Sequence, residues 1–130
     1  MTQHLILGEI DITPLLKAKK QLDNALAVAQ SPLEKTGAIK SFEFCYELAW
    51  KTMKRLLAQK GIETNNPRDT FRQAALNHFI ASPEPWFEFI RRRNLSTHCY
   101  DEDLAEEVFE WLPQFRDTLA EFIDTIGSLS

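Results

Sequence analysis

The chain has 130 residues, enough to bury a hydrophobic core without disulfides or a structural metal. Its apolar share of 44% and charged share of 26% are typical of a globular protein, and no stretch predicts a membrane span or a signal peptide. We therefore expect one cytoplasmic domain over residues 1–130. The two cysteines and three histidines lack the spacing of metal ligands, so no metal or cofactor is expected.

The formal net charge of −4 conceals an uneven distribution along the chain. Residues 1–100 contain 14 Lys or Arg and 10 Asp or Glu, whereas residues 101–130 contain 1 and 9. The change of sign falls between Tyr100 and Asp101. An anionic partner such as RNA could therefore bind the basic part of the chain despite the negative total charge.

The first helix is expected after a short mixed segment, residues 1–12, which we interpret as an arm or half-turn packed on the rest of the fold. Thr13-Pro14 predicts a helix start, with Thr13 as the N-cap and Pro14 at the first helical position. Apolar residues then recur at helical spacing.

The longest helix is predicted from Ser31 to about Lys60. Ser31-Pro32-Leu33-Glu34 has the pattern of a capping box, and Gly61 supplies the left-handed residue that commonly ends a helix. One face of this helix is apolar and should lie in the core; it comprises Ile39, Phe42, Cys45, Tyr46, Ala49, Trp50, Met53, Leu56 and Leu57.

Three further helices are predicted in the second half of the chain. Asn66-Pro67-Arg68-Asp69 opens a short helix, and Ser82-Pro83-Glu84-Pro85 ends it and opens the next. Asp101 is the expected N-cap of a helix from about residue 102 to 126, which Pro113 should kink. The fold class is therefore all-α: an antiparallel up-and-down four-helix bundle with an extra short helix and a kinked C-terminal helix.

The segment Arg93-Asn94-Leu95-Ser96-Thr97-His98-Cys99-Tyr100 has the densest set of chemically active side chains. His98 can take up and release protons near neutral pH, and the guanidinium of Arg93 suits phosphate oxygens. Asn94 offers an amide donor and acceptor, and Tyr100 offers a hydroxyl for ligand contact or modification.

Arg93 and His98 are five residues apart, about 140° around a regular helix. For both to reach one phosphate, the helix must end or loosen between Arg93 and Asp101. These residues also have structural explanations. A histidine near a helix end is commonly a surface residue, Tyr100 can pack between helices, and Arg91-Arg92-Arg93 suits the negative end of a helix dipole.

The pattern Arg93-Asn94-x-x-x-His98-x-Tyr100 resembles the R-x4-H-x-Y signature of HEPN domains, specifically the branch paired with a minimal nucleotidyltransferase (MNT). The block Phe42–Lys51, then Pro67-Arg68-Asp69, then Trp86 recur in this order in the branch called nucleotidyltransferase substrate-binding proteins. The resemblance covers roughly residues 39–110.

This resemblance implies a homodimer in which two copies of the motif face each other. It also implies a metal-independent endoribonuclease, in which the 2′-hydroxyl of RNA attacks the neighbouring phosphate. His98 would handle the proton, Arg93 would stabilise the phosphorane, and Asn94 would hold His98 or the phosphate in place.

The partner nucleotidyltransferase of such a toxin–antitoxin module would act as antitoxin by adding AMP to Tyr100. Arg91 and Arg92 depart from the more acidic character expected before the motif, and we assign them to RNA phosphate binding. Two alternatives stay open. One is a non-catalytic subunit that binds a substrate or nucleotide for the nucleotidyltransferase, and the other is a bundle with a purely structural role.

Overall fold

The computed structural model describes residues 5–7 and 9–129, so the first four residues of the expected N-terminal arm lie outside its described part. The elements follow in the order β1 (Leu5–Ile6), β2 (Ile10–Asp11), α1 (Thr13–Val28), α2 (Pro32–Gln59), α3 (Pro67–Leu76), α4 (Glu84–Leu95), the 3₁₀ turn η1 (Ser96–His98), α5 (Glu102–Phe109) and α6 (Leu112–Gly127). The prediction of an all-α fold is confirmed.

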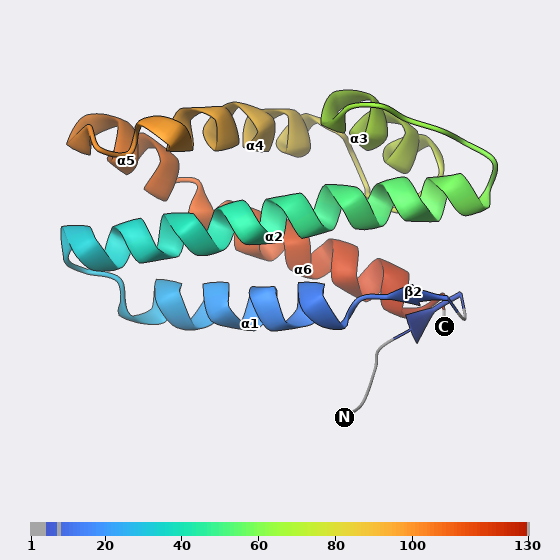
Figure 1. Ribbon diagram of the computed structural model, residues 1–130, viewed down its shortest axis with the longest axis horizontal. Coiled ribbons are helices and arrows are strands. Elements are labelled where there is room, and N and C mark those ends of the chain that lie inside the picture. Colours follow the sequence, from blue (N-terminus) through green and yellow to red (C-terminus); the bar gives the residue numbers. More distant parts are fainter. Residues whose placement is uncertain (1–4, 8, 130) are drawn as a thin grey trace.

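The helices run up and down along a common axis (Figure 1). α1 and α2 lie side by side in opposite directions, and α3 and α4 follow one another along the other side of α2. α5 lies at the end of the bundle where the chain turns back, and α6 returns in contact with α1 and α2. The third arm of the bundle is therefore built from two helices, of which α3 is the extra short one.

The N-terminal segment forms a small antiparallel hairpin, with Leu5 opposite Asp11 and Ile6 opposite Ile10. Ile6, Ile10 and Ile12 are buried, so the hairpin packs on the core. The prediction that Thr13 caps α1 was wrong, because Thr13 is already helical and Ile12 occupies the N-cap. The Asp11 carboxylate instead accepts a hydrogen bond of 2.9 Å from the backbone N–H of Thr13.

The predicted ends of α2 are confirmed. The Ser31 hydroxyl accepts from the backbone N–H of Glu34, and the Glu34 carboxylate accepts from the N–H of Ser31. At the other end Gly61 has a φ of 78°, the left-handed conformation that glycine tolerates best. Asn66 likewise caps α3, since its side chain accepts from the backbone N–H of Asp69.

The expectation of one kinked C-terminal helix was wrong, because α5 and α6 are separate helices. The Trp111 N–H bonds to the carbonyl of Val108, so the α-helical pattern has already stopped there. Pro113 stands at the second position of α6, where its missing N–H costs no helical hydrogen bond. Pro113 thus starts a helix instead of bending one.

Aromatic side chains from four helices form the centre of the core. Phe42 of α2 meets Phe115 of α6 edge to face at 4.8 Å, and Phe89 of α4 meets Phe115 at 5.0 Å. Such edge-to-face pairs are favourable for the aromatic quadrupole. Of the predicted apolar face of α2, only Trp50 is half-buried instead of buried.

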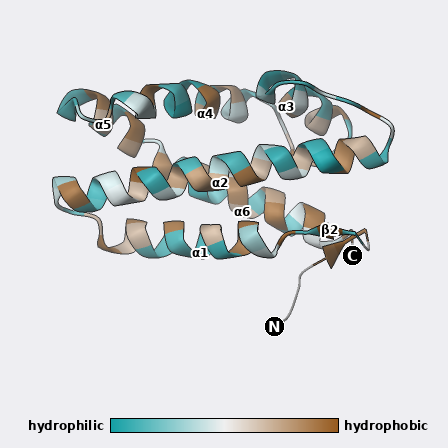
Figure 2. Cartoon of the chain, viewed as in Figure 1, coloured by the Kyte–Doolittle hydropathy of each residue, from teal (hydrophilic) through white to brown (hydrophobic). Residues whose placement is uncertain are grey.

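Hydrophobic and hydrophilic residues alternate along the helices (Figure 2). This is the pattern of helices with one buried and one exposed face. No helix in residues 5–7 and 9–129 is long and apolar enough to cross a membrane.

Candidate functional site

The motif segment lies where α4 ends and the chain turns into α5. Helix α4 stops at Leu95, and η1 follows as a tighter 3₁₀ turn. The Asp101 carboxylate then caps α5 by accepting from the N–H groups of Asp103 and Leu104. The required loosening of the helix between Arg93 and Asp101 is therefore present. His98 is exposed and does not enter the core.

Two of the predicted site residues meet directly on this turn. His98 Nδ1 lies 3.2 Å from the hydroxyl oxygen of Tyr100, and the two rings meet edge to face. Tyr100 is 85% exposed, so the hydroxyl is accessible to a large partner. The pair combines a proton-transfer group with a nucleophilic oxygen at the surface.

Arg93 is held on the other side of the turn by Glu43 of α2. The closest guanidinium nitrogen, Nη1, lies 3.7 Å from Glu43 Oε2. The Ser96 hydroxyl lies 2.6 Å from the same Oε2 and 2.6 Å from the carbonyl oxygen of Arg93. One carboxylate therefore joins α2 to the end of α4 and to η1.

No role for Glu43 was predicted from the sequence, where Glu43 appears only as part of the block Phe42–Lys51. Its distance from Arg93 in sequence concealed the contact. A possible signal was its position one residue after buried Phe42, which places a carboxylate at the edge of the apolar face of α2.

The three arginines before the turn have different surroundings. Arg92 is only 11% exposed: it bonds to Glu88, donates to the carbonyl oxygen of Glu107 at 2.8 Å, and stacks over Trp111. These contacts connect α4 to α5 and to Trp111, the N-cap residue of α6, so Arg92 has little surface left for a ligand. Arg91 is mostly exposed and pairs with Glu88 at 3.2 Å.

In the part of the chain that the structure describes, neither Asn94 nor Arg93 makes a side-chain hydrogen bond or ion pair to His98. Within the described residues, the Asn94 side chain makes no hydrogen bond, and only its backbone carbonyl accepts one, from Thr97. No hydrogen bond or ion pair joins the side chains of Arg93 and His98 there either. The structure thus brings Tyr100 to His98, and Arg93 to Glu43, as two neighbouring groups.

A surface hollow of about 550 Å³ adjoins the turn. It lies between α2 and the motif and is lined by Thr36, Ile39, Lys40, Glu43, Ser96, Thr97, Cys99 and Tyr100. Burial raises the pKa of the Cys99 thiol, and the Glu43 carboxylate raises it further. Cys99 therefore lines the hollow as a neutral thiol and not as a thiolate nucleophile.

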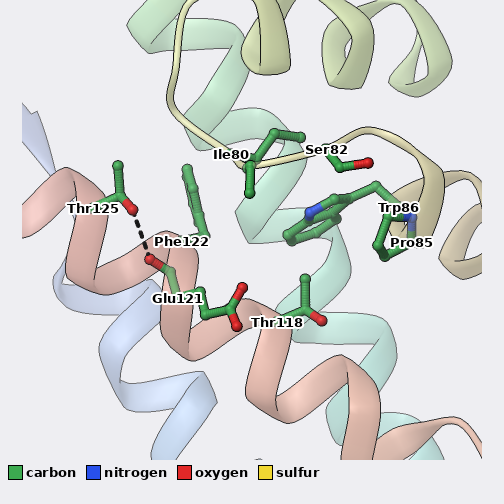
Figure 3. Close-up of a pocket in the computed structure, with 9 residues that line it drawn as sticks. Ile80, Ser82, Pro85, Trp86, Thr118, Glu121, Phe122 and Thr125 are labelled. Atoms are coloured by element: carbon green, nitrogen blue, oxygen red, sulfur yellow. Dashed lines mark hydrogen bonds between the residues drawn. The ribbon is translucent and has the colours of Figure 1, made fainter.

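A second cavity, of about 220 Å³, lies elsewhere in the molecule (Figure 3). Trp86, Phe122 and Glu121 line it, between the loop before α4 and helix α6. None of its lining residues belongs to the motif. The described residues contain no group of three or more His, Cys, Asp or Glu that could hold a metal ion.

A family model described as "Nucleotidyltransferase substrate binding protein like" matches residues 10–127. A Haemophilus influenzae protein named "Probable ribonuclease HepT" is 36% identical over 84 residues. That alignment covers 61% of this chain and 58% of the relative, so it spans less than two thirds of the relative's length.

Two solved structures share the fold. A Thermus thermophilus protein has a TM-score of 0.80 at 26% identity, covering 86% of this chain and 98% of that one. A Haemophilus influenzae structure, described as revealing the fold of a substrate binding domain of a nucleotidyltransferase, has a TM-score of 0.79 at 26% identity. It covers 86% of this chain and 96% of the other.

Proposed function

The chain belongs to the family of nucleotidyltransferase substrate binding protein-like proteins, and from this membership we propose that it is a metal-independent endoribonuclease. It acts as the HEPN toxin of a type VII-like toxin–antitoxin module and is inhibited by a partner MNT-type nucleotidyltransferase. The observation that carries the proposal is the exposed turn after α4, on which His98 and Tyr100 lie outside the core, five and seven residues after Arg93. The name of the Haemophilus influenzae relative supports the ribonuclease activity.

The proposed reaction is an internal transfer at one RNA phosphate. The 2′-hydroxyl oxygen attacks the adjacent phosphorus while His98 accepts its proton. The guanidinium of Arg93 stabilises the charge on the phosphorane. The 5′-oxygen leaves with the electron pair of its bond to phosphorus and takes a proton from an imidazolium. The products are a 2′,3′-cyclic phosphate and a 5′-hydroxyl.

A homodimer completes this chemistry. One chain supplies one Arg93 and one His98, whereas the reaction needs one imidazole to accept a proton and an imidazolium to give one. A two-fold axis between two motif turns doubles both groups around a single RNA strand. Asn94, which is exposed in the last turn of α4, then faces the phosphate rather than His98.

Tyr100 is the proposed switch. Its hydroxyl oxygen attacks the α-phosphate of ATP on the partner nucleotidyltransferase, the phenolic proton is lost, and pyrophosphate leaves. In the product, a phosphodiester replaces the Tyr100 hydroxyl, whose oxygen lies 3.2 Å from His98 Nδ1 in the unmodified protein. The adjoining hollow of about 550 Å³ is large enough for adenosine. An added anion at this place repels the RNA backbone.

The alternative function is a non-catalytic subunit that binds a substrate or nucleotide for the nucleotidyltransferase. The family description and the Haemophilus influenzae structure favour it. In that case the hollow beside Tyr100 binds the nucleotide without any RNA cleavage.

RNA cleavage by purified protein in EDTA separates the two functions. We expect His98→Ala to lower the cleavage rate by about 10²- to 10⁴-fold, the usual contribution of a general acid–base group. His78→Asn is the matched control, because His78 is also exposed and its φ of 65° suits asparagine. Equal cleavage by wild type and His98→Ala, with both proteins folded, would rule out the ribonuclease mechanism.

A further inference from the structure

Tyr46 of α2 is an unpaired polar group beside the motif. Its side chain is 3% exposed, with the ring packed against Phe71 of α3. Its hydroxyl makes no hydrogen bond within the described residues, although buried tyrosine hydroxyls usually find a partner. The hydroxyl is nevertheless not fully enclosed by protein. The Tyr46 hydroxyl is therefore a hydrogen-bond donor without a protein partner, just below the protein surface.

The charges of two arginines act on this phenol. Burial, followed by the Glu47 carboxylate, raises the pKa of Tyr46, and the positive charges of Arg93 and Arg68 oppose that rise. Both guanidiniums are therefore close enough to act on the same phenol. Arg93 Nε is itself buried without a hydrogen-bond partner. The unpaired Tyr46 hydroxyl, together with the guanidinium groups near it, suits an acceptor-rich ligand such as phosphate.

A pair of arginines extends this surface onto α3. The guanidinium carbons of Arg68 and Arg72 lie 4.6 Å and 5.5 Å from the centre of the same ring, Phe87 of α4. Both side chains are exposed, and neither has a carboxylate within 4 Å among the described residues. Two like charges on one ring repel each other unless an anion joins them.

This surface continues to the motif along one face of α4. Phe87 and Asn94 are seven residues apart, which places them on the same face about 10 Å from each other. At the Phe87 end of this face lie Arg68 and Arg72 of α3. At the Asn94 end, α4 leads into the turn that contains His98 and Tyr100. A single-stranded backbone can follow this face with one phosphate at each end.

We propose that Arg68, Arg72 and Tyr46 form a second phosphate-binding subsite, which holds the RNA backbone beside the scissile phosphate at Arg93. The subsite rests on the proposed ribonuclease function for the identity of its ligand. Arg68 and Arg72 also provide flat guanidinium faces on which a neighbouring base can stack. The two guanidiniums only donate hydrogen bonds and the Tyr46 hydroxyl can donate one, which favours phosphate oxygens over a mixed protein surface.

Binding of a short fluorescein-labelled single-stranded RNA tests the subsite without requiring cleavage. Fluorescence anisotropy is measured in the His98→Ala background at several KCl concentrations. We expect Arg68→Ala/Arg72→Ala to weaken binding about tenfold and to reduce the slope of log K against log salt by about 1. Tyr46→Phe should weaken binding about threefold and leave the slope unchanged.

Lys17→Ala/Lys20→Ala is the matched control, since it removes two exposed positive charges from α1, on the opposite side of α2. Arg68→Lys/Arg72→Lys retains the charge and should restore the salt slope. Restoration would show that the alanine variant weakens binding through lost phosphate contacts and not through unfolding. An equal loss of affinity in the Lys17/Lys20 control overturns the subsite, because net charge alone then explains the binding. The subsite is also overturned if Arg68→Ala/Arg72→Ala binds RNA as the wild type does but no longer binds the co-expressed nucleotidyltransferase. That result would assign the surface to the nucleotidyltransferase.

The test of the subsite and the test of the ribonuclease give separate answers. Arginine-dependent RNA binding without cleavage by the wild type supports the subsite and contradicts the ribonuclease. Cleavage that depends on His98, with RNA binding unaffected in Arg68→Ala/Arg72→Ala, supports the ribonuclease and contradicts the subsite.

Discussion

The Glu43 carboxylate lies 3.7 Å from the Arg93 guanidinium, although the two residues stand fifty positions apart on α2 and α4. The same carboxylate oxygen lies 2.6 Å from the Ser96 hydroxyl. The Glu43 side chain is 18% exposed, so solvent screens these contacts only in part. The position of the proposed phosphate-binding cation therefore depends on a residue outside the motif.

Glu43→Gln should impair RNA cleavage more than it impairs stability. The amide can still accept from Ser96, but the ion pair with Arg93 is lost. We expect cleavage to fall by about ten- to a hundredfold through misplacement of the guanidinium, and the free energy of unfolding to fall by about 1 kcal/mol. Glu47→Gln, one turn along the same helix, is the charge-matched control. Equal cleavage rates in the two variants would contradict the positioning role.

Tyr100→Phe should prevent modification and leave the fold unchanged. The side chain is 85% exposed, so loss of its hydroxyl should change the free energy of unfolding by less than about 0.5 kcal/mol. After co-expression with the nucleotidyltransferase, intact mass spectrometry should show AMP on the wild type and none on Tyr100→Phe. Tyr46→Phe, which alters a buried tyrosine, should still acquire AMP. AMP on Tyr100→Phe would place the modification at another residue.

Stability should decrease at alkaline pH because of Cys45. Burial raises the pKa of its thiol from 9.0 to about 12, so between these values the folded protein keeps a proton that the unfolded chain loses. The contribution of Cys45 to stability is then full below about pH 9 and falls as pH rises, by at most about 1.4 kcal/mol per pH unit, and Tyr46, whose pKa is also raised, adds to the decrease above about pH 10. Urea unfolding at several pH values measures this slope. Cys45→Ala should lower stability at neutral pH and flatten the alkaline slope more than Cys99→Ser does.

Two glycines of the α2 region should respond to alanine in opposite directions. Gly61 has a φ of 78°, so Gly61→Ala should destabilise by about 1 kcal/mol. Gly37 lies inside α2, and an added methyl group would meet nothing within 4 Å. Gly37→Ala should therefore stabilise by about 0.5 to 1 kcal/mol. Thermal unfolding of the two variants checks the sign, and a stabilising Gly61→Ala would contradict the role of the left-handed conformation.

Local signals predicted most of the helix boundaries. Ser31, Asn66 and Asp101 cap helices as expected, because a cap depends on side chains within three residues of the backbone groups they satisfy. Pro113 was misinterpreted because proline is compatible with both a kink and a helix start. The choice depended on whether Trp111 would continue the helix, and its backbone bonds in a tighter turn instead.

The sequence by itself determined the all-α class, the motif segment and the need for a helix to loosen before His98. These properties follow from local periodicity, from caps and from the spacing of a few side chains. Only the tertiary structure decided which groups surround each arginine. Arg92 donates to the carbonyl oxygen of Glu107 in α5, Arg93 lies beside Glu43 of α2, and Arg68 lies over Phe87 of α4. Each of these contacts joins different helices, and helical periodicity carries no information on which helices pack together.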